Sequence, residues 1–494
     1  MHLNESRTFG SALGDWTAGS GPAYRLLAAA IRSRAESGEL SAGTRLPAER
    51  SLADALGVSR TTVVAAYDLL RQEGWLESRR GSGSRLLRAG APGSAVAAAD
   101  PGRSGFERST ILRSLVEASE SKVEFMGLHL PAASPFVAEA LEHIGEDLAK
   151  LVGHHGYWPV GLPALRSAIA THLTKSGLPS HPEEILVTHG AQEAIGLAAS
   201  LFLAPGRTVV LEDPTYVGAI DVFAAAGARL SPVPVSDHGV RMDFLRDAVA
   251  REAPSLIYLM PSFQNPAGVV TPESHRREIA AIAAERGIPI FEDDALANLD
   301  MGHRPPKPIA SYAPAAPILS VGSLSKLMWG GLRVGWIRAP EPLIGRLARK
   351  KALGDLGNSA VSQVVAARLL PRAGEIREFR RRQISERLAV MEKELSRLLP
   401  EWTWRRPGGG LSLWVRLPRG NAVEFGRVAQ RHGVSILPGT ICSPSNGCAE
   451  FLRLPFVLES AKIREGVRLL AEAWRAYAPA PAPARERAAL EVLV

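Results

Sequence analysis

A segment rich in Ala, Gly, Ser and Pro, running from residue 89 to about residue 122, divides this 494-residue chain into two unequal parts. Such a composition buries little apolar surface, so we expect a flexible linker there. The chain is also too long for a single hydrophobic core. We therefore expect a small domain over 20–88 and a large domain over 123–476. A mobile tail is expected over 477–494, where Ala and Pro alternate.

The composition is that of a soluble globular protein, with 46% hydrophobic and 22% charged residues. The longest apolar run, 194–204, is too short to cross a bilayer and predicts a buried helix, so we expect no membrane partner. Cys442 and Cys448 form neither a disulfide framework nor a metal-binding pattern, so we expect no metal. The N-terminal residues lack an apolar secretory segment, and a cytoplasmic location is expected. A net charge of +8 permits a polyanionic partner without requiring one.

Short β-branched runs alternate with longer amphipathic segments through the large domain. The runs at 184–188, 208–211, 255–259 and 288–291 are examples. Strands that alternate with helices predict an α/β domain with a mainly parallel sheet.

Three helical patterns occur in order in the small domain. The third begins at Ser59, a natural N-cap, and places Val63, Tyr67 and Leu70 on one face. Gly57, in the turn before it, can adopt a positive φ. Two short helices joined in this way predict a helix-turn-helix, whose second helix can enter the major groove of DNA.

Polar side chains project from the start of the third helix, at Ser59, Arg60, Thr61 and Thr62. Helped by the helix dipole, they can contact phosphates and base edges. The segment 79–85 then combines arginines with glycines and has no acid, which predicts a wing of two strands around a glycine tip. The alternative is a surface hairpin with ordinary arginines.

Polar groups of the large domain follow the expected strands. The segment 188–192 opens a helix whose free N–H groups could face an anion. Tyr216 could stack on a flat ring, and Asn265 could donate to a phenolate oxygen. Asp293 ends another strand, at the edge where α/β sheets gather ligands, and could keep a pyridine nitrogen protonated.

Lys326 lies close to Ser323, Ser325 and Arg333 in a run of small and apolar residues. A lysine in such surroundings can hold an aldehyde cofactor as a Schiff base while the arginine and hydroxyls bind a phosphate. Each of these groups also has an ordinary structural explanation, such as a solvated lysine or a packed loop tyrosine. Their order along the chain is what indicates a cofactor site.

Residues 24–88 closely resemble the winged helix-turn-helix of the GntR family, above all at 43–53, 57–63 and 81–83. The resemblance implies that operator DNA is contacted by a set of residues in the two DNA-facing helices and the wing. They are Arg50, Arg60, Thr61, Thr62, Arg80 and Gly81.

Residues from about 123 to 476 resemble fold type I aminotransferases of class I, which use pyridoxal 5′-phosphate (PLP). The resemblance implies that Lys326 forms the internal aldimine, Asp293 binds the pyridine nitrogen and Asn265 binds the phenolic oxygen. It also places Tyr216 on the ring face. The phosphate would be bound by Ala191, Gln192, Ser323, Ser325 and Arg333.

The same resemblance gives two further residues a role. Arg453 would hold a ligand α-carboxylate, and Tyr157 would reach the phosphate of a neighbouring subunit. One departure concerns the tyrosine that these proteins carry two or three residues after the aspartate. Ala295 and Leu296 occupy those positions here, so a hydroxyl to the phenolic oxygen is missing and efficient transamination is in doubt.

A GntR-type winged helix joined by a linker to an aminotransferase-like domain is the architecture of the MocR/GabR subfamily. The resemblance implies a homodimeric, PLP-dependent regulator that binds double-stranded operator DNA. It would sense PLP, or a small amine or amino acid, through aldimine exchange, without physiological turnover. One alternative is an active PLP-dependent aminotransferase with a fused DNA-binding domain. Another is a regulator whose large domain has lost the cofactor and serves only to dimerise.

Overall fold

The computed structural model describes most of both parts of the chain. The described residues are 9, 13, 16, 22–36, 40, 44–72, 75–79, 83–86, 121–127 and 135–477. The chain divides into two compact units, Met1–Gly105 and Phe106–Val494. The expected linker and tail lie almost wholly outside the described residues, and their boundaries stay a prediction.

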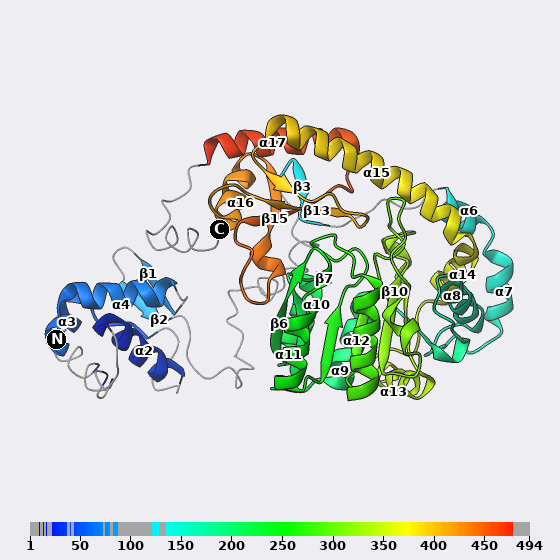
Figure 1. The fold of residues 1–494 in the computed structure, drawn as a ribbon, viewed down its shortest axis with the longest axis horizontal. Helices are drawn as coiled ribbons and strands as arrows, with labels where there is room; N and C mark the ends of the chain where they lie inside the picture. The colour runs from blue at the N-terminus through cyan, green and yellow to red at the C-terminus, as the bar shows by residue number, and fades with distance from the viewer. Residues whose placement is uncertain are drawn as a thin grey trace. The chain divides into compact units, whose positions relative to one another are not determined.

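The described part of the N-terminal unit contains three helices and a two-stranded antiparallel hairpin (Figure 1). The elements are α2 (Ala23–Glu36), α3 (Glu49–Leu56), α4 (Arg60–Gln72), β1 (Leu76–Arg79) and β2 (Gly83–Leu86). This is the winged helix-turn-helix expected from the sequence, with the wing formed by β1 and β2.

The third helix of this unit begins and packs as predicted. Ser59 Oγ accepts a hydrogen bond from the N–H of Thr62 at 3.1 Å, which satisfies one of the free donors at the helix start. Gly57 has φ 67°, a conformation that glycine adopts without strain. Val63 and Tyr67 are fully buried, so the opposite side of α4 is left to face outward.

The larger unit is built on an eight-stranded sheet in the order β4-β11-β10-β9-β8-β5-β6-β7. The strands are β4 (Ile185–Thr188), β5 (Thr208–Asp213), β6 (Arg229–Ser236), β7 (Gly239–Val240), β8 (Leu256–Leu259), β9 (Ile290–Asp293), β10 (Ile318–Ser323) and β11 (Gly335–Arg338). All neighbouring pairs from β10 to β6 are parallel, whereas β11 is antiparallel to both β10 and β4. The predicted mainly parallel sheet is confirmed.

Helices cover both faces of this sheet, each over its own apolar core. One face carries α9 (Ala191–Phe202), α10 (Val217–Ala225) and α13 (Glu341–Ala352). The other carries α8 (Pro163–Lys175), α11 (Met242–Glu252), α12 (Glu273–Arg286) and α14 (Ala360–Leu369). Two short helices, α6 (Phe136–Glu142) and α7 (Gly145–Val152), pack against α14.

A second, five-stranded sheet forms a smaller layer, seen at the top of Figure 1. Its strands, in order, are β12 (Thr403–Trp404), β13 (Ser412–Arg416), β15 (Phe451–Pro455), β14 (Val434–Pro438) and β3 (Val123–Phe125). It packs with α16 (Ala422–Arg431) and α17 (Ser460–Ala476). The long helix α15 (Ala373–Leu398) joins the layers, because Ile376 lies in one core and Leu388 in the other.

Short 3₁₀ helices complete the larger unit, at Pro182–Glu184, Ile309–Tyr312, Gly330–Leu332, Leu370–Arg372 and Gly439–Cys442. Tyr477, the first residue of the expected tail, is only 5% exposed, and its hydroxyl accepts a hydrogen bond from the N–H of Asn421 at 3.0 Å. None of the described helices has the length and apolar character to span a bilayer.

The carboxyl ends of five parallel strands lie along one edge of the large sheet. Strands β4, β5, β8, β9 and β10 all run the same way, so their carboxyl ends lie together. Ligands bind at this edge in α/β sheets.

Candidate cofactor site and nucleic-acid interface

Asp293 ends β9 and is buried, with 2% of its surface exposed. Its Oδ2 accepts a hydrogen bond from the hydroxyl of Tyr258 at 2.8 Å, and its Oδ1 accepts one from the N–H of Ala295 at 3.0 Å. Burial raises the pKa of Asp293 to about 6, and the two hydrogen bonds oppose that rise. Because each oxygen accepts a hydrogen bond, the carboxylate of Asp293 keeps one orientation, in which it can face a ring nitrogen.

Lys326 follows β10 by three residues and is half-buried. Burial, with the charges of Arg453 and Arg333, lowers the pKa of its ammonium to about 8. The neutral amine, which is the nucleophile toward an aldehyde, is therefore much better populated near neutral pH than in a solvated lysine.

The turn between β4 and α9 faces the segment after β10, and together they form the concavity that is expected to bind an anion. Gly190 has φ 92° and precedes the first N–H groups of α9, those of Ala191 and Gln192. A Cβ at Gly190 would lie 3.5 Å from Nη2 of Arg333 and 3.7 Å from Oγ of Ser323, so these groups meet around one point. A free helix N-terminus with a guanidinium and hydroxyls fits a phosphate.

Ser325 completes this concavity. Its main-chain N–H donates to Oγ of Ser323 at 3.2 Å. Its own Oγ is buried and has no hydrogen-bond partner among the described residues. A buried hydroxyl without a partner costs free energy unless a ligand supplies one.

The side chain of Gln192 forms hydrogen bonds within the protein, and the expected place of this residue at the phosphate stays a prediction. Its Oε1 accepts a hydrogen bond from the hydroxyl of Tyr216 at 3.0 Å, and its Nε2 donates to the carbonyl of Gly218 at 3.3 Å. Gln192 therefore positions Tyr216, and only its main-chain N–H remains for an anion. Burial and the charge of Asp293 raise the pKa of Tyr216 to about 12, so its hydroxyl stays protonated.

Asn265 and Arg453 present polar groups that the described residues leave partly unsatisfied. Asn265 is 5% exposed and its buried Oδ1 has no hydrogen-bond partner within the described part of the chain. Arg453, on β15, is 4% exposed; it donates to the carbonyl of Met126, and its Nε has no partner there either. Among the described residues no carboxylate pairs with Arg453, which leaves a buried cation suited to a ligand carboxylate.

Tyr157 stands apart from these groups. It is 58% exposed, and its ring stacks on His155 with 6.4 Å between the ring centroids. Its main-chain N–H donates to Nδ1 of His155 at 3.0 Å, and its expected role in a neighbouring subunit stays a prediction.

Two residues of the site, Tyr258 and Glu212, were missed from the sequence. Tyr258 lies opposite Phe291 in the register of β8 and β9, and residues two apart on a strand share a face, so its hydroxyl reaches Asp293. Glu212 is fully buried and accepts a hydrogen bond from the N–H of Met260 at 2.9 Å, which ties the end of β5 to the end of β8. The alternation of side chains along β8 and β9 was the available signal for Tyr258.

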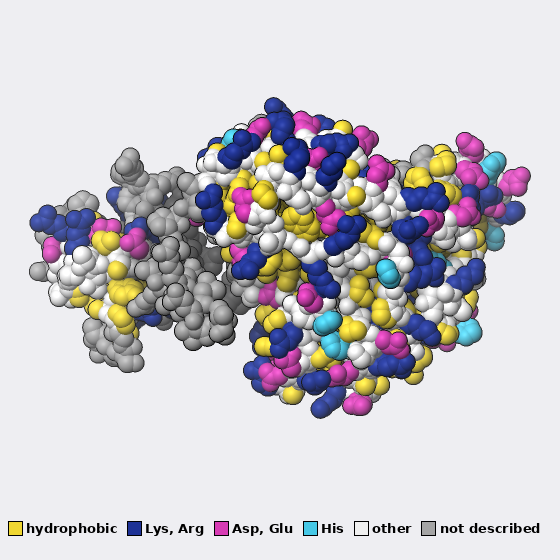
Figure 2. All heavy atoms as spheres, turned by 45° about the horizontal axis from the view of Figure 1, so that its top comes forward, with side chains coloured by type: hydrophobic (Ala, Val, Ile, Leu, Met, Phe, Trp, Pro, Cys, Tyr) yellow, Lys and Arg dark blue, Asp and Glu magenta, His cyan; other side chains and the backbone are white. Residues whose placement is uncertain are grey.

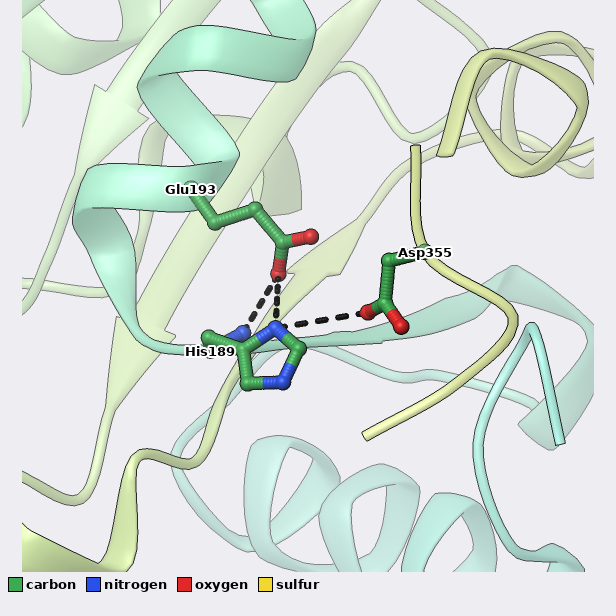
Figure 3. Close-up of side chains that lie close together, drawn as sticks. All are labelled: His189, Glu193 and Asp355. Atoms are coloured by element: carbon green, nitrogen blue, oxygen red, sulfur yellow. Dashed lines mark hydrogen bonds and ion pairs between the residues drawn. The ribbon is translucent and has the colours of Figure 1, made fainter. Parts of the chain in front are cut away.

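A cluster of charged side chains braces the residue before Gly190 (Figure 3). Nδ1 of His189 lies 3.1 Å from Oε2 of Glu193 and 3.4 Å from Oδ2 of Asp355. These three residues have a spacing that a metal ion could use. However, the buried ammonium of Lys351 contacts both carboxylates and already supplies the positive charge. We interpret the cluster as a brace for the β4–α9 turn.

The groups that the sequence predicts to face DNA lie at the start of α4. Ser59, Arg60 and Thr61 are exposed and Thr62 is half-buried. The side chain of Arg60 is 68% exposed and lies 3.3 Å from Glu49 of α3, while Arg50 of α3 is also exposed. Arg80 and Gly81, the expected wing tip, lie outside the described residues.

Basic side chains form no continuous surface on the face of the larger unit that Figure 2 shows. Figure 2 shows Lys and Arg there interspersed with Asp and Glu over the whole face. Mixed charges of this kind give no continuous field for a polyanion.

Two family models match the chain. "Aminotransferase class I and II" matches residues 126–470, and "Bacterial regulatory proteins, gntR family" matches residues 23–86. The HTH-type transcriptional regulator YisV of Bacillus subtilis is 33% identical over 80% of this chain and 84% of its own length. The probable rhizopine catabolism regulatory protein MocR of Rhizobium meliloti is 31% identical over 84% of this chain and 86% of its own length.

The chain belongs to the MocR/GabR subfamily of GntR regulators. This MocR-type protein is therefore a transcriptional regulator whose N-terminal unit binds DNA and whose larger unit has the fold type I aminotransferase fold. Among solved structures, LysN, the α-aminoadipate aminotransferase of Thermus thermophilus, superimposes with a TM-score of 0.69 at 32% identity. The match covers 75% of this chain and 95% of LysN, which was solved with N-(5′-phosphopyridoxyl)-L-leucine.

PLP is the cofactor of this aminotransferase family, and the MocR-type site fits it. The partnerless Oγ of Ser325 and the concavity at Gly190 match a phosphate. Asp293 matches a pyridine nitrogen, and Lys326 has an amine of lowered pKa for an aldehyde. Ala295 contributes only its main-chain N–H, which goes to Asp293, so the missing tyrosine hydroxyl is not replaced from that position.

Proposed function

We propose that this protein is a PLP-dependent regulator whose larger unit senses a small amine or amino acid and thereby changes the DNA affinity of the winged helix. The observation that carries the proposal is that Arg453 lies near Lys326. Arg453 is near enough to lower the pKa of Lys326, and it is buried without a carboxylate partner among the described residues. The PLP aldehyde at Lys326 would accept an amine and Arg453 would accept a carboxylate, and the two together suit an amino acid.

When bound, PLP supplies an aldehyde that can link either to Lys326 or to the amine of a ligand. Asp293 would hold the pyridine nitrogen, with Tyr258 fixing its orientation. Arg333, Ser323, Ser325 and the N–H groups of Ala191 and Gln192 would bind the phosphate. Asn265 would donate to the phenolic oxygen, and Tyr216, braced by Gln192, would cover the ring.

Release of Lys326 is the change that would reach DNA. Lys326 belongs to the segment that leads from β10 to Arg333, and Arg333 donates a hydrogen bond to the carbonyl of His189. A ligand that favours the released lysine shifts the protein toward whichever arrangement accommodates it, by its difference in affinity for the two. A regulator of this kind acts where its DNA is, and we assign it to the cytoplasm.

An exposed apolar patch supports a homodimer. The patch consists of Val152, Tyr157, Leu353, Leu356 and Val361, which are 82%, 58%, 86%, 54% and 46% exposed. Its two segments adjoin, since a Cβ at Gly357 would lie 2.8 Å from the carbonyl oxygen of Trp158. Apolar surface of this kind marks a protein interface, and a second copy would bring its Tyr157 toward a neighbouring site.

A second candidate function is amino-group transfer. The 2-aminoadipate transaminase of Thermus thermophilus is 34% identical over 69% of this chain and 85% of its own length. The missing tyrosine at Ala295 argues against rapid turnover, because a hydroxyl at the phenolic oxygen helps tune the lysine linkage.

The test is an absorbance titration of the PLP-loaded protein against a panel of amines and amino acids, combined with a gel shift on its own upstream DNA. The proposal requires one ligand class to change both the absorbance band and the DNA affinity. Lys326→Ala should lose the imine band and the ligand response, while Lys350→Ala, an exposed control, should keep both. A ligand that is turned over at enzyme-like rates without any effect on DNA binding would favour the aminotransferase instead.

A further inference from the structure

A cavity lies on the α8 side of the large sheet, away from the α9 side that carries Gly190. It has a volume of about 120 Å³ and reaches Val321 and Gly322 of β10 and Trp336 of β11. An adjoining cavity of about 360 Å³ shares His172, Lys175, Arg304 and Arg377 with it, so the two form one recess from the surface to the sheet. A cavity of this size can hold several waters or a small molecule.

The inner end of the recess contains polar atoms that the protein leaves unsatisfied. Nε1 of Trp336 is buried without an acceptor among the described residues, in a side chain only 2% exposed. The indole packs directly against Gly322, because a Cβ on that residue would lie 2.3 Å from the ring. Oδ1 of Asp294 is also buried without a partner in the described part of the chain. Unpaired buried donors and acceptors are rare and point to a missing partner.

The charges that face the recess are mainly positive. Lys175 and Arg304 form no ion pair with an acid among the described residues, whereas Arg377 lies 3.0 Å from Asp300. His172 meets Trp336 edge-on, with 6.0 Å between the rings. Burial, Lys175 and Arg377 lower the pKa of His172 to about 4, so this ring is neutral near pH 7.

Asp294 is the one acid among the described residues that line the recess. The positive charge of a buried arginine, Arg276, acts on it. Arg276 is fully buried and donates to Oγ of Ser262 at 3.0 Å, and its charge favours the ionised form of Asp294. Burial acts more strongly in the other direction and raises the pKa of Asp294.

We propose that this recess is a binding site for a small organic carboxylate, with Trp336 Nε1 donating to the carboxylate and Lys175 and Arg304 attracting it at the entrance. A monoanionic head suits the inner end better than a phosphate dianion, because Asp294 would oppose the second charge. Bound there, the carboxylate would lie beside Asp294, the residue after Asp293. It would thus touch the opposite side of the strand end that the proposed PLP site uses.

The test uses the full-length protein and two probes, acetate and succinate, at constant ionic strength. Neither probe has an amine, so neither can displace Lys326. Binding is followed by calorimetry and by tryptophan fluorescence, to which Trp336 contributes from inside the recess. We expect saturable binding of at least one probe.

Variants separate the recess from the PLP site. Trp336→Phe removes the N–H and keeps a ring, and Lys175→Gln with Arg304→Gln removes two exposed cations that no core packing depends on. Each change should weaken binding about tenfold or more, as loss of a charged or buried hydrogen bond does. Arg453→Gln, on the PLP side, should leave the affinity for the probe unchanged.

Three results would overturn the proposal. The first is no saturable binding of either probe, and the second is equal affinity in the wild type and the Lys175→Gln/Arg304→Gln protein. The third is loss of binding in Arg453→Gln, which would show that the anion binds at the cofactor site. If Trp336→Phe fails to fold, as judged by circular dichroism, the double variant decides alone. PLP binding is measured separately by absorbance. A failure of the carboxylate site therefore leaves the proposed function untouched, and a failure of the proposed function leaves the carboxylate site untouched.

Discussion

Glu212, Glu292 and Asp293 are buried carboxyl groups near the edge of the large sheet, and burial changes their acid–base behaviour. Burial raises the pKa of Asp293 to about 6, and those of Glu212 and Glu292 to about 8. Each folded-state pKa therefore exceeds the unfolded value, so the native protein binds more protons than the unfolded chain in the interval between the two. In that interval the contribution of each group to stability falls as pH rises.

Glu212 offers a direct check at the level of one residue. Glu212→Gln keeps an oxygen for the N–H of Met260 but cannot ionise. As pH rises from about 5 to about 8, the wild type should lose stability relative to the variant by a few kcal/mol. Urea unfolding of the cofactor-free proteins at both pH values measures the difference. Glu285→Gln, an exposed control on α12, should show the same pH dependence of the free energy of unfolding as the wild type. The same pH dependence in Glu212→Gln would contradict the argument.

Arg60 tests the nucleic-acid surface at the same scale. Its side chain projects from the first turn of α4, and its contact with Glu49 is a solvent-exposed ion pair of small worth. Arg60→Ala should therefore leave the fold intact and weaken operator binding by about 1–3 kcal/mol if it reads a base. Arg71→Ala, at the other end of α4, is the matched control. Fluorescence anisotropy on operator DNA gives the comparison, and equal affinity for the two variants would remove Arg60 from the interface.

At the scale of elements, the β4–α9 turn is held by a partner from a distant helix. Lys351 is buried near the end of α13, and its ammonium joins Glu193 of α9 to Asp355 of the following connection. Lys351→Met removes the cation and leaves two carboxylates facing one another. We expect a loss of about 2 kcal/mol, less than for a fully buried pair because both acids are partly exposed.

The same variant has a consequence for the cofactor that a loss of stability alone would not produce. The turn carries Gly190 and the carbonyl of His189 that Arg333 binds, so weaker phosphate binding should appear as a lower PLP affinity. Lys350→Met, at the exposed neighbouring position, should change neither unfolding nor PLP affinity. An unaltered PLP affinity in Lys351→Met would show that the turn keeps its shape without the cluster.

The elements themselves were largely predictable, because local patterns determine them. The alternation of β-branched runs predicted strands that the structure has at 185–188, 208–213 and 256–259. The N-cap at Ser59 and the positive φ at Gly57 predicted where the helix-turn-helix turns. The residue pattern also predicted that Lys326 and Asp293 belong to one site, since parallel strands end at the same edge.

What the sequence could not give depends on register and on contacts between distant segments. The pairing of Tyr258 with Asp293 requires the alignment of β8 with β9. Gln192 was placed on the phosphate, and only the packing of α9 against the loop before α10 reveals that its side chain holds Tyr216. The recess at Trp336 joins α8, β10, β11 and the 297–308 segment, which no local pattern brings together.

At the scale of the whole molecule, the apolar patch predicts how the protein assembles. Leu353 and Leu356 are 86% and 54% exposed on the connection between α13 and α14, and in a monomer they would face water. Changing both to Glu should place two charges in the interface, where like charges from two copies would meet, and should yield a monomer. Light scattering after gel filtration measures the mass. Phe244→Glu, on α11 and 46% exposed, is the control that should stay dimeric.

The monomer would also distinguish two uses of the interface. Tyr157 lies in the same patch, so a site completed by the partner's Tyr157 should lose PLP affinity in the Leu353→Glu/Leu356→Glu protein and in Tyr157→Phe alike. If the interface serves only to pair the winged helices on two half-sites, PLP affinity should persist while operator affinity falls steeply. A Leu353→Glu/Leu356→Glu protein that stays dimeric would place the subunit contact on another face, and Tyr157 would then have no route to a second site.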